Sequence, residues 1–199
     1  MNDFKRISLE FNAAAKELEK ETPRISLLAV NRFLIDLKRR VFTLGQDHKE
    51  TSIGEYSSKP MLAGEKTFKR HGSQIAGAGA ISKVFGSKKK RATRKWVTVN
   101  GKRLIVLEGG YKEFRKLVGR KVDKVTLFLS GDLFRSIITG KTSKGAAVGI
   151  NRDEDYVKAT ANEKHFGKTI FVPSRKSEDK VEVLVTDEIE KIINANISN

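Results

Sequence analysis

Apolar and charged positions alternate along the first 45 residues with the spacing of an amphipathic helix. Across residues 3–42 the apolar side chains recur at intervals of three and four, which places them on one face of a helix. Thr22 and Pro23 have the residue types of a helix N-cap and a first helical position. Gly45 has the residue type that commonly follows a helix end. The pattern predicts an N-terminal unit at 1–45 that is either a helical hairpin or a single bent arm.

Periodicity fades between residues 46 and 95. Glycine is frequent there, and seven basic residues lie between positions 72 and 95. This composition favours an extended segment over a packed element. Long loops in compact domains are often functional. We therefore expect residues 46–95 to form an extended, Gly/Lys-rich basic loop.

Short apolar runs alternate with turn residues across the remaining 96–199. Asn100-Gly101 separates two β-rich runs and is typical of a tight hairpin. A short helix is expected from Tyr111 to a stop at Gly119, with Arg115 on its outer face. Trp96 is expected either to anchor the edge of a core or to stack on a nucleic-acid base.

The later part of this region predicts further strands and helices. Strands are expected at Val125–Leu129, Ala146–Ile150 and Ile170–Val172, with a polar turn at Gly140–Gly145. Helices are expected after a cap at Ser130 or Asp132 and continuing through Ile137 and Ile138, from Asp153 to Gly167, and from about Glu178 onward. The whole chain predicts an α+β fold, with a small mixed, mainly antiparallel sheet packed against helices. We expect one domain with an N-terminal helical arm and a long basic loop as extensions.

The net charge of +16 is concentrated in the middle of the chain. Residues 59–124 hold nineteen Lys and Arg against four Asp and Glu, whereas 1–58 and 125–199 are close to balanced. Such a concentration repels itself unless it faces a polyanion or is spread through a hydrated loop. Both interpretations stay open from the charge alone.

Catalytic and metal-binding patterns are missing from the sequence. There is no cysteine, which excludes disulfides, thiolate metal sites and cysteine nucleophiles. His48, His71 and His165 have no histidine or carboxylate at ligand spacing. Ser130-Gly131-Asp132 lacks the upstream glycine of an esterase motif. We expect neither an enzyme nor a cofactor or metal, and a nuclease that uses the acidic clusters near 153–155 and 187–190 is the weakest alternative.

Export and membrane insertion are also not expected. The N-terminal residues are charged and lack the apolar core of a secretion signal, and no run of eighteen apolar residues exists. We expect a soluble protein that is not exported by the standard route and has no membrane partner.

An ordered series of short motifs covers the region from Trp96 onward. The series consists of Trp96 before a helix, Tyr111-Lys-Glu-Phe-Arg115, Leu127-Phe-Leu-Ser-Gly-Asp-Leu-Phe-Arg-Ser136, Val148-Gly149, Tyr156 to Ala161, Asn162-Glu-Lys-His-Phe-Gly167 and Ile170-Phe-Val-Pro-Ser-Arg175. In this order the motifs resemble the tail-completion and virion-morphogenesis proteins of tailed bacteriophages over about residues 96–195. The chain departs from the family pattern at Val157, where alanine is frequent, and at Lys176-Ser177, where an apolar pair is frequent.

The resemblance implies an α+β subunit that assembles as a homo-oligomeric ring at the head–tail junction. It implies a structural virion protein, made in the host cytoplasm and located in the neck or tail. Six copies are expected for a tail-end ring and twelve for a connector ring. The neighbours would be head–tail connector, tail terminator or tail tube proteins.

The resemblance also gives the charge map a physical meaning, because a ring around the DNA path can present basic residues to packaged DNA without reading its bases. The expected nucleic-acid-facing residues are Lys83, Lys88, Lys89, Lys90, Arg91, Arg94 and Lys95. The expected assembly-interface residues are Phe4, Phe11, Phe33, Trp96, His165, Phe166 and Arg175. The alternative from another class is a free-standing basic protein that binds DNA, RNA or ribosomes.

Overall fold

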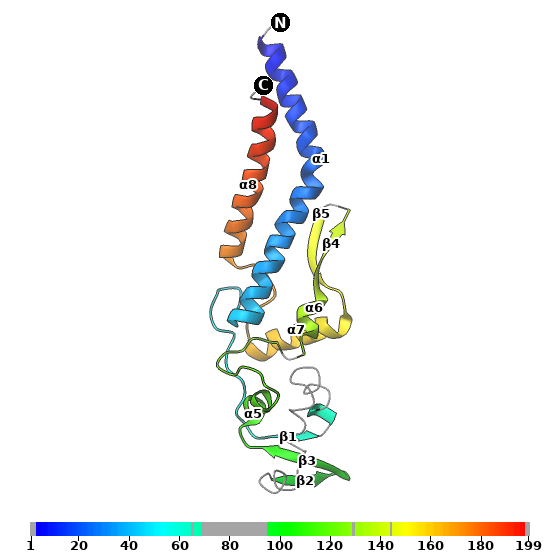
Figure 1. Ribbon diagram of the computed structural model, residues 1–199, viewed down its shortest axis with the longest axis vertical. Coiled ribbons are helices and arrows are strands. Elements are labelled where there is room, and N and C mark those ends of the chain that lie inside the picture. The colour runs from blue at the N-terminus through cyan, green and yellow to red at the C-terminus, as the bar shows by residue number, and fades with distance from the viewer. Residues whose placement is uncertain (1–2, 65, 69–94, 129, 144, 198–199) are drawn as a thin grey trace.

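The molecule is built around a single long helix, α1 (Asp3–Lys38). The computed structural model describes residues 3–64, 66–68, 95–128, 130–143 and 145–197. The C-terminal helix α8 (Arg175–Ile197) packs along α1, and both chain ends lie near the same tip (Figure 1). We refer to α1 and α8 together as the two-helix arm. A three-stranded sheet lies at the opposite end of the molecule from this tip.

The expected helix break at Thr22 and Pro23 does not occur, so the hairpin interpretation is wrong, and one continuous helix forms the N-terminal arm. Pro23 lies inside α1, and the Thr22 hydroxyl donates to the Leu18 carbonyl at 2.7 Å instead of capping a new helix. Pro23 is exposed, so water can solvate the carbonyl group that its missing N–H leaves unpaired. Packing against α8 and against the hairpin of β4 (Ile137–Thr142) and β5 (Gly145–Ile150) supports the helix on either side.

The predicted end of the first unit at Gly45 is confirmed. The helix widens into a π-helical segment, η1 (Arg39–Leu44), and Gly45 follows in the left-handed conformation with φ +69°. A Cβ atom on Gly45 would lie 2.4 Å from the Val125 carbonyl oxygen. Only glycine therefore fits this close approach without displacement of the backbone.

The three-stranded sheet is antiparallel with the order β1–β3–β2. Its strands are β1 (Met61–Gly64), β2 (Trp96–Val99) and β3 (Lys102–Leu107). The hairpin prediction is confirmed: Asn100 and Gly101 link β2 to β3 with φ values of 50° and 69°. β1 lies within the stretch that the sequence predicts as a loop, and the buried Phe68 follows it.

A second, separate sheet is the antiparallel hairpin of β4 (Ile137–Thr142) and β5 (Gly145–Ile150), which packs on α1. The predicted continuation of the preceding helix through Ile137 and Ile138 is wrong, because α6 (Asp132–Ser136) ends before them. Gly131 takes the N-cap position, and the predicted cap Ser130, one residue earlier, accepts a hydrogen bond from the Asp132 amide at 3.4 Å. Ile137 pairs with Ile150 in the ladder, where β-branched side chains pack well.

The predicted strands at Val125–Leu129 and Ile170–Val172 are wrong. No strand forms at 125–128 or 170–172, and Leu129 lies outside the described residues. Side chains take the place of a neighbouring strand: the Thr126 amide donates to the Tyr56 hydroxyl at 3.0 Å, and the Ile170 amide donates to a Glu163 carboxylate oxygen at 2.6 Å. The backbone is therefore satisfied without sheet pairing.

The remaining helix predictions are confirmed in position. They are α5 (Gly110–Leu117), α7 (Asp153–Phe166) and α8, which begins at Arg175, three residues before the expected start. Gly167 ends α7 with φ +62°, and Gly119 follows α5 with φ +76°. The expectation that Arg115 points outward is wrong, because this side chain is buried.

Two buried clusters form the core, and the fold is α+β as expected, with small antiparallel sheets in place of one mixed sheet. The first cluster gathers residues from α1, η1, α6, α7 and the segments around Ile53, Val125 and Ile170. The second gathers Phe114 and Val118 with side chains of β1 and β3. None of the helices in the described part of the chain combines the length and apolar character that a membrane span requires.

Candidate assembly and nucleic-acid interface

Most of the expected nucleic-acid-facing residues, Lys83, Lys88, Lys89, Lys90, Arg91 and Arg94, lie outside the described residues. Lys95 is exposed at the start of β2, and its amino group lies 3.7 Å from the Glu108 carboxylate. An exposed ion pair of this kind contributes little to stability and leaves the lysine available to a phosphate.

Further cations, absent from the predicted set, are exposed at the same end of the molecule. Lys102 and Arg103 lie on β3, Lys116 lies on α5, and Lys121 follows that helix. The only sequence signal for them is the excess of charge over residues 59–124. They extend the candidate phosphate-contacting surface from Lys95 onto an ordered sheet and helix.

Trp96 anchors the edge of the second cluster. Its side chain is half-buried and packs against that cluster, and the Arg103 guanidinium lies 4.7 Å from the centre of its ring. Because Arg103 lies over the ring and the second cluster packs against it, Trp96 fits the core interpretation better than base stacking.

The expected assembly residues on α1 differ in exposure. Phe11 is 60% exposed, together with the neighbouring Ile7 and Leu9, whereas Phe33 is half-buried against the first cluster. The side chain of Phe4 lies outside what the structure describes. The N-terminal half of α1 therefore presents apolar side chains to solvent.

The remaining predicted residues lie near the base of the arm. His165 is exposed and meets the half-buried Phe166 edge to face, with ring centroids 4.7 Å apart. Arg175 is exposed at the start of α8 and forms an ion pair with Asp179 at 3.1 Å. His165 and Phe166 are neighbours at the end of α7, whereas Trp96 and Phe11 lie toward opposite ends of the molecule (Figure 1).

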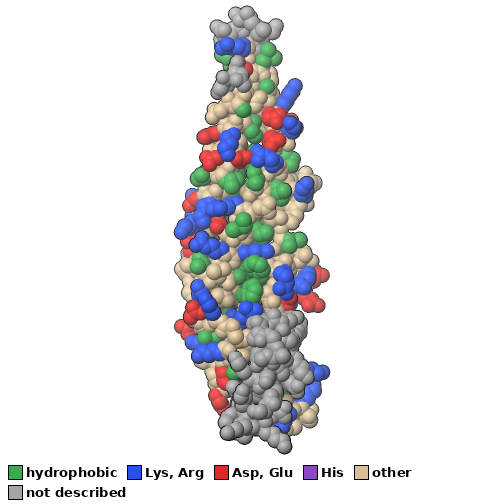
Figure 2. All heavy atoms as spheres, viewed as in Figure 1, with side chains coloured by type: hydrophobic (Ala, Val, Ile, Leu, Met, Phe, Trp, Pro, Cys, Tyr) green, Lys and Arg blue, Asp and Glu red, His purple; other side chains and the backbone are tan. Residues whose placement is uncertain are grey.

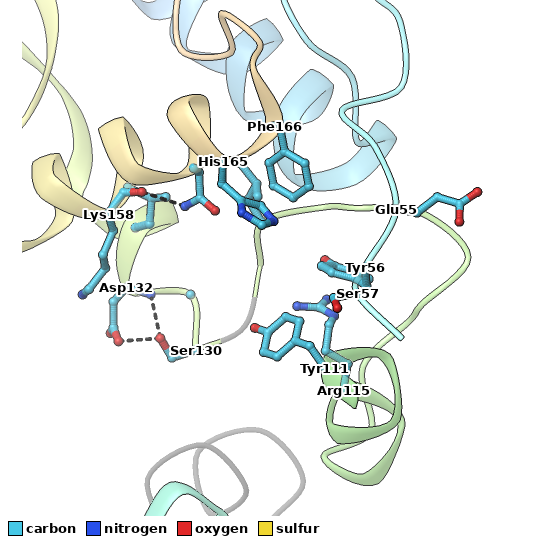
Figure 3. A pocket seen from close by; sticks show the side chains of 14 residues that line it. Glu55, Tyr56, Ser57, Tyr111, Arg115, Ser130, Asp132, Lys158, His165 and Phe166 are labelled. Carbon is cyan, nitrogen blue, oxygen red and sulfur yellow. Dashed lines mark hydrogen bonds between the residues drawn. The ribbon is translucent and has the colours of Figure 1, made fainter. Parts of the chain in front are cut away.

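A cleft of about 560 Å³ separates α5 from α7, as Figure 3 shows. Tyr111 and Arg115 enter it from α5, His165 and Phe166 enter it from α7, and Tyr56 lines the wall between them. Aromatic rings and hydrogen-bond donors therefore face one another across the cleft, which is suited to holding a polar or aromatic group.

Arg115 is the best-anchored side chain of this cleft, with only 2% of its surface exposed. It donates to the Phe128 carbonyl at 3.0 Å and to the Lys121 carbonyl at 3.3 Å, and its guanidinium lies 4.2 Å from the centre of the Tyr56 ring. Burial raises the pKa of Tyr111, although the charge of Arg115 acts in the opposite direction. Tyr111 therefore stays a neutral hydroxyl at physiological pH.

The polar groups at the α6 side of the cleft are held by hydrogen bonds to neighbouring side chains. The Ser130 hydroxyl donates to the Asp132 carboxylate, and this bond, with help from Arg135 and against the effect of burial, lowers the pKa of Asp132. Among the described residues, no hydrogen bond joins His165 to Ser130 or Asp132. Within the same part of the chain, no group of three or more His, Asp and Glu side chains could hold a metal ion.

Comparison with known proteins returns nothing for this chain: no protein-family model, no curated protein and no solved structure matches it.

Proposed function

We propose that this chain is a non-enzymatic structural virion protein of the phage neck or tail-completion class. It assembles as a ring at the head–tail junction and helps to join or seal head and tail around the DNA path. It is made in the host cytoplasm and located in the neck or tail of the particle. Its neighbours are head–tail connector, tail terminator or tail tube proteins.

The ordered motif series supports the assignment to this class. Its members come from different elements, yet Val125, Ala159 and Ile170, which lie within or beside three of the motifs, belong to the same buried cluster. A shared core gives the order of the motifs a physical reason, because each motif supplies one part of a single packed unit.

The apolar surface of the two-helix arm carries the assembly part of the proposal. Phe11, Ile35 and Val183 are each about 60% exposed, and Figure 2 shows hydrophobic side chains at the surface between charged ones along the arm. Two helices alone cannot cover their own apolar stripes. Apolar surface of this extent is typical of a subunit that buries it against neighbours.

The charge distribution supports a DNA path at the other end of the subunit. The excess of fifteen positive charges over residues 59–124 includes the exposed Lys102, Arg103 and Lys116 around the three-stranded sheet. Contacts between such side chains and phosphates are independent of base sequence. We propose that this end faces packaged DNA in the ring.

Native mass spectrometry of the purified protein, combined with a DNA-binding titration, tests the proposal. We expect a discrete closed oligomer of six or twelve copies that binds duplex DNA of any sequence with an affinity that falls with salt. A monomer at every concentration that binds DNA tightly, with the same steep salt dependence, contradicts the ring and favours the free-standing nucleic-acid-binding protein. A protein without DNA affinity at low salt contradicts the DNA-facing part.

A further inference from the structure

An apolar groove of about 490 Å³ runs between α1 and α8 near the base of the two-helix arm. Val30 and Phe33 of α1 and Val181 and Val185 of α8 form its floor. The carboxylates of Glu178 and Glu182 lie one turn apart on its α8 side, and neither has an ion pair or side-chain hydrogen bond among the described residues. The groove is therefore apolar within and negatively charged along one rim.

The charge of this rim argues against self-pairing of the groove. A symmetric dimer through the same patch would bring Glu178 and Glu182 of one copy toward those of the other. Like charges held together in a contact that excludes water are costly. The groove instead fits an apolar helix face that carries a positive charge.

The outer face of α7 has this character. Tyr156 and Val157 are 63% and 65% exposed, the highest values among the large apolar side chains of the described residues. Lys164 lies about two turns further along the same face, is exposed, and has no ion pair among the described residues. The small exposed residues Thr160 and Ala161 lie between them and leave room for close approach.

The charges on α7 also determine the direction in which this helix would lie in the groove. Its acidic residues Asp153 and Glu154 begin the helix, about 15 Å from Lys164 at 1.5 Å per residue. Docking with Lys164 over Glu178 and Glu182 keeps these carboxylates away from the acidic rim. The opposite direction brings like charges together.

We propose that the outer face of α7 in one subunit docks into the α1–α8 groove of the next subunit. The two patches differ and belong to the same chain, so the contact is head-to-tail and closes into a ring when the rotation between copies permits. This inference rests on the proposed ring assembly and names the contact that builds it. Tyr156 and Val157 contribute apolar burial, and the pairing of Lys164 with the two glutamates sets the register.

Charge reversal tests the contact. Lys164→Glu and Glu182→Lys are each expected to raise the protein concentration for half-assembly roughly fivefold or more, and the double variant is expected to return it to within about twofold of the unmodified protein. Tyr156→Ala is expected to weaken assembly without rescue by either charge change. Matched controls are Glu190→Lys on α8 and Lys141→Glu on β4, which are exposed, belong to neither patch and are expected to assemble normally.

Mass photometry over a concentration series gives the readout, and thermal unfolding confirms that each variant folds as the unmodified protein does. Rings that form equally well with either single reversal overturn the inference while the proposed ring function stands. Single reversals that weaken assembly without restoration in the double variant also overturn it, because the two residues then contact different partners. Failure of the unmodified protein to assemble at any concentration contradicts the ring function itself, and the inference with it.

Discussion

The Arg40 guanidinium donates a hydrogen bond to the Ile170 carbonyl at 3.0 Å and so joins η1 to a segment 130 positions later in the chain. The same side chain donates to the Val172 carbonyl, and only 4% of its surface is exposed. Burial lowers the pKa of Arg40, while the charges of Asp47 and Glu50 act in the opposite direction. A buried cation here holds a stretch of backbone that has no neighbouring strand.

Replacement of this arginine tests its role. Arg40→Met keeps much of the side-chain volume but leaves the carbonyls of Ile170 and Val172 without their donor. We expect the free energy of unfolding to fall by about 3 kcal/mol, since unpaired buried acceptors are costly. Urea denaturation measures the change. Arg39→Met is the control, because Arg39 is adjacent in sequence and exposed; a similar loss for both variants would contradict the assigned role.

Arg115 holds the backbone around Phe128 in the same way as Arg40 holds the backbone around Ile170. Arg115→Met removes the donors to the Lys121 and Phe128 carbonyls and the contact with the Tyr56 ring, so we expect a loss of about 2 to 3 kcal/mol in unfolding free energy. Lys116→Met, at an exposed position one residue later, is expected to change it by less than about 0.5 kcal/mol. Equal stabilities of the two variants would refute this account of the cleft.

Gly45 and Gly101 form a matched pair, because both have φ +69° but only Gly45 has atoms in the path of a Cβ. Gly101→Ala is expected to cost about 1 kcal/mol for the left-handed backbone alone. Gly45→Ala adds an overlap with the Val125 carbonyl oxygen, and we expect it to cost roughly 2 kcal/mol more than Gly101→Ala. Thermal unfolding of both variants measures the difference. Indistinguishable melting temperatures would show that the close approach is absent in solution.

The lowered pKa of Asp47 predicts that the folded protein loses stability in acid. Burial acts to raise the pKa of this carboxyl, but hydrogen bonds from Thr51 and Lys168 outweigh it and lower the pKa from 3.8 to about 2. Because the folded-state pKa is the lower one, the stabilisation is complete above about pH 5 and is lost as the pH falls through 4 toward 2. The shift corresponds to about 2 kcal/mol.

The pH dependence of unfolding checks this interpretation. Asp47→Asn is expected to be less stable than the unmodified protein at pH 7 and to approach it near pH 2, whereas Asp123→Asn, at an exposed position, is expected to follow the unmodified protein throughout. A constant difference between Asp47→Asn and the unmodified protein across this range would contradict the assigned pKa.

Local signals in the sequence predicted the elements whose ends they control. Asn100-Gly101 located the β2–β3 hairpin, Asp153 began α7, and Gly45 and Gly167 ended helical segments, because each of these residues acts through its own backbone or immediate neighbours. Pro23 misled the prediction because packing of α1 against α8 and the β4–β5 hairpin, which no local pattern shows, offsets the cost of a proline inside the helix.

Long-range contacts account for the elements that sequence patterns predicted wrongly. The apolar runs at 125–128 and 170–172 have the composition of buried strands, and Val125 and Ile170 are fully buried. Hydrogen bonds to their backbone come from the distant side chains of Tyr56, Glu163, Arg40 and Arg115. Nothing local distinguishes Arg40 from Arg39, or Arg115 from Lys116. The same limit applies to the apolar groove between α1 and α8, which exists only once α8 packs on α1.

Electron microscopy of the assembled protein tests the central claim most directly. We predict a closed ring of six or twelve subunits, with residues 59–124 lining the central opening and the two-helix arms in contact with neighbouring subunits. An open filament, a preparation that contains only monomers, or a ring with the basic region on its outer wall would contradict the proposed role at the head–tail junction.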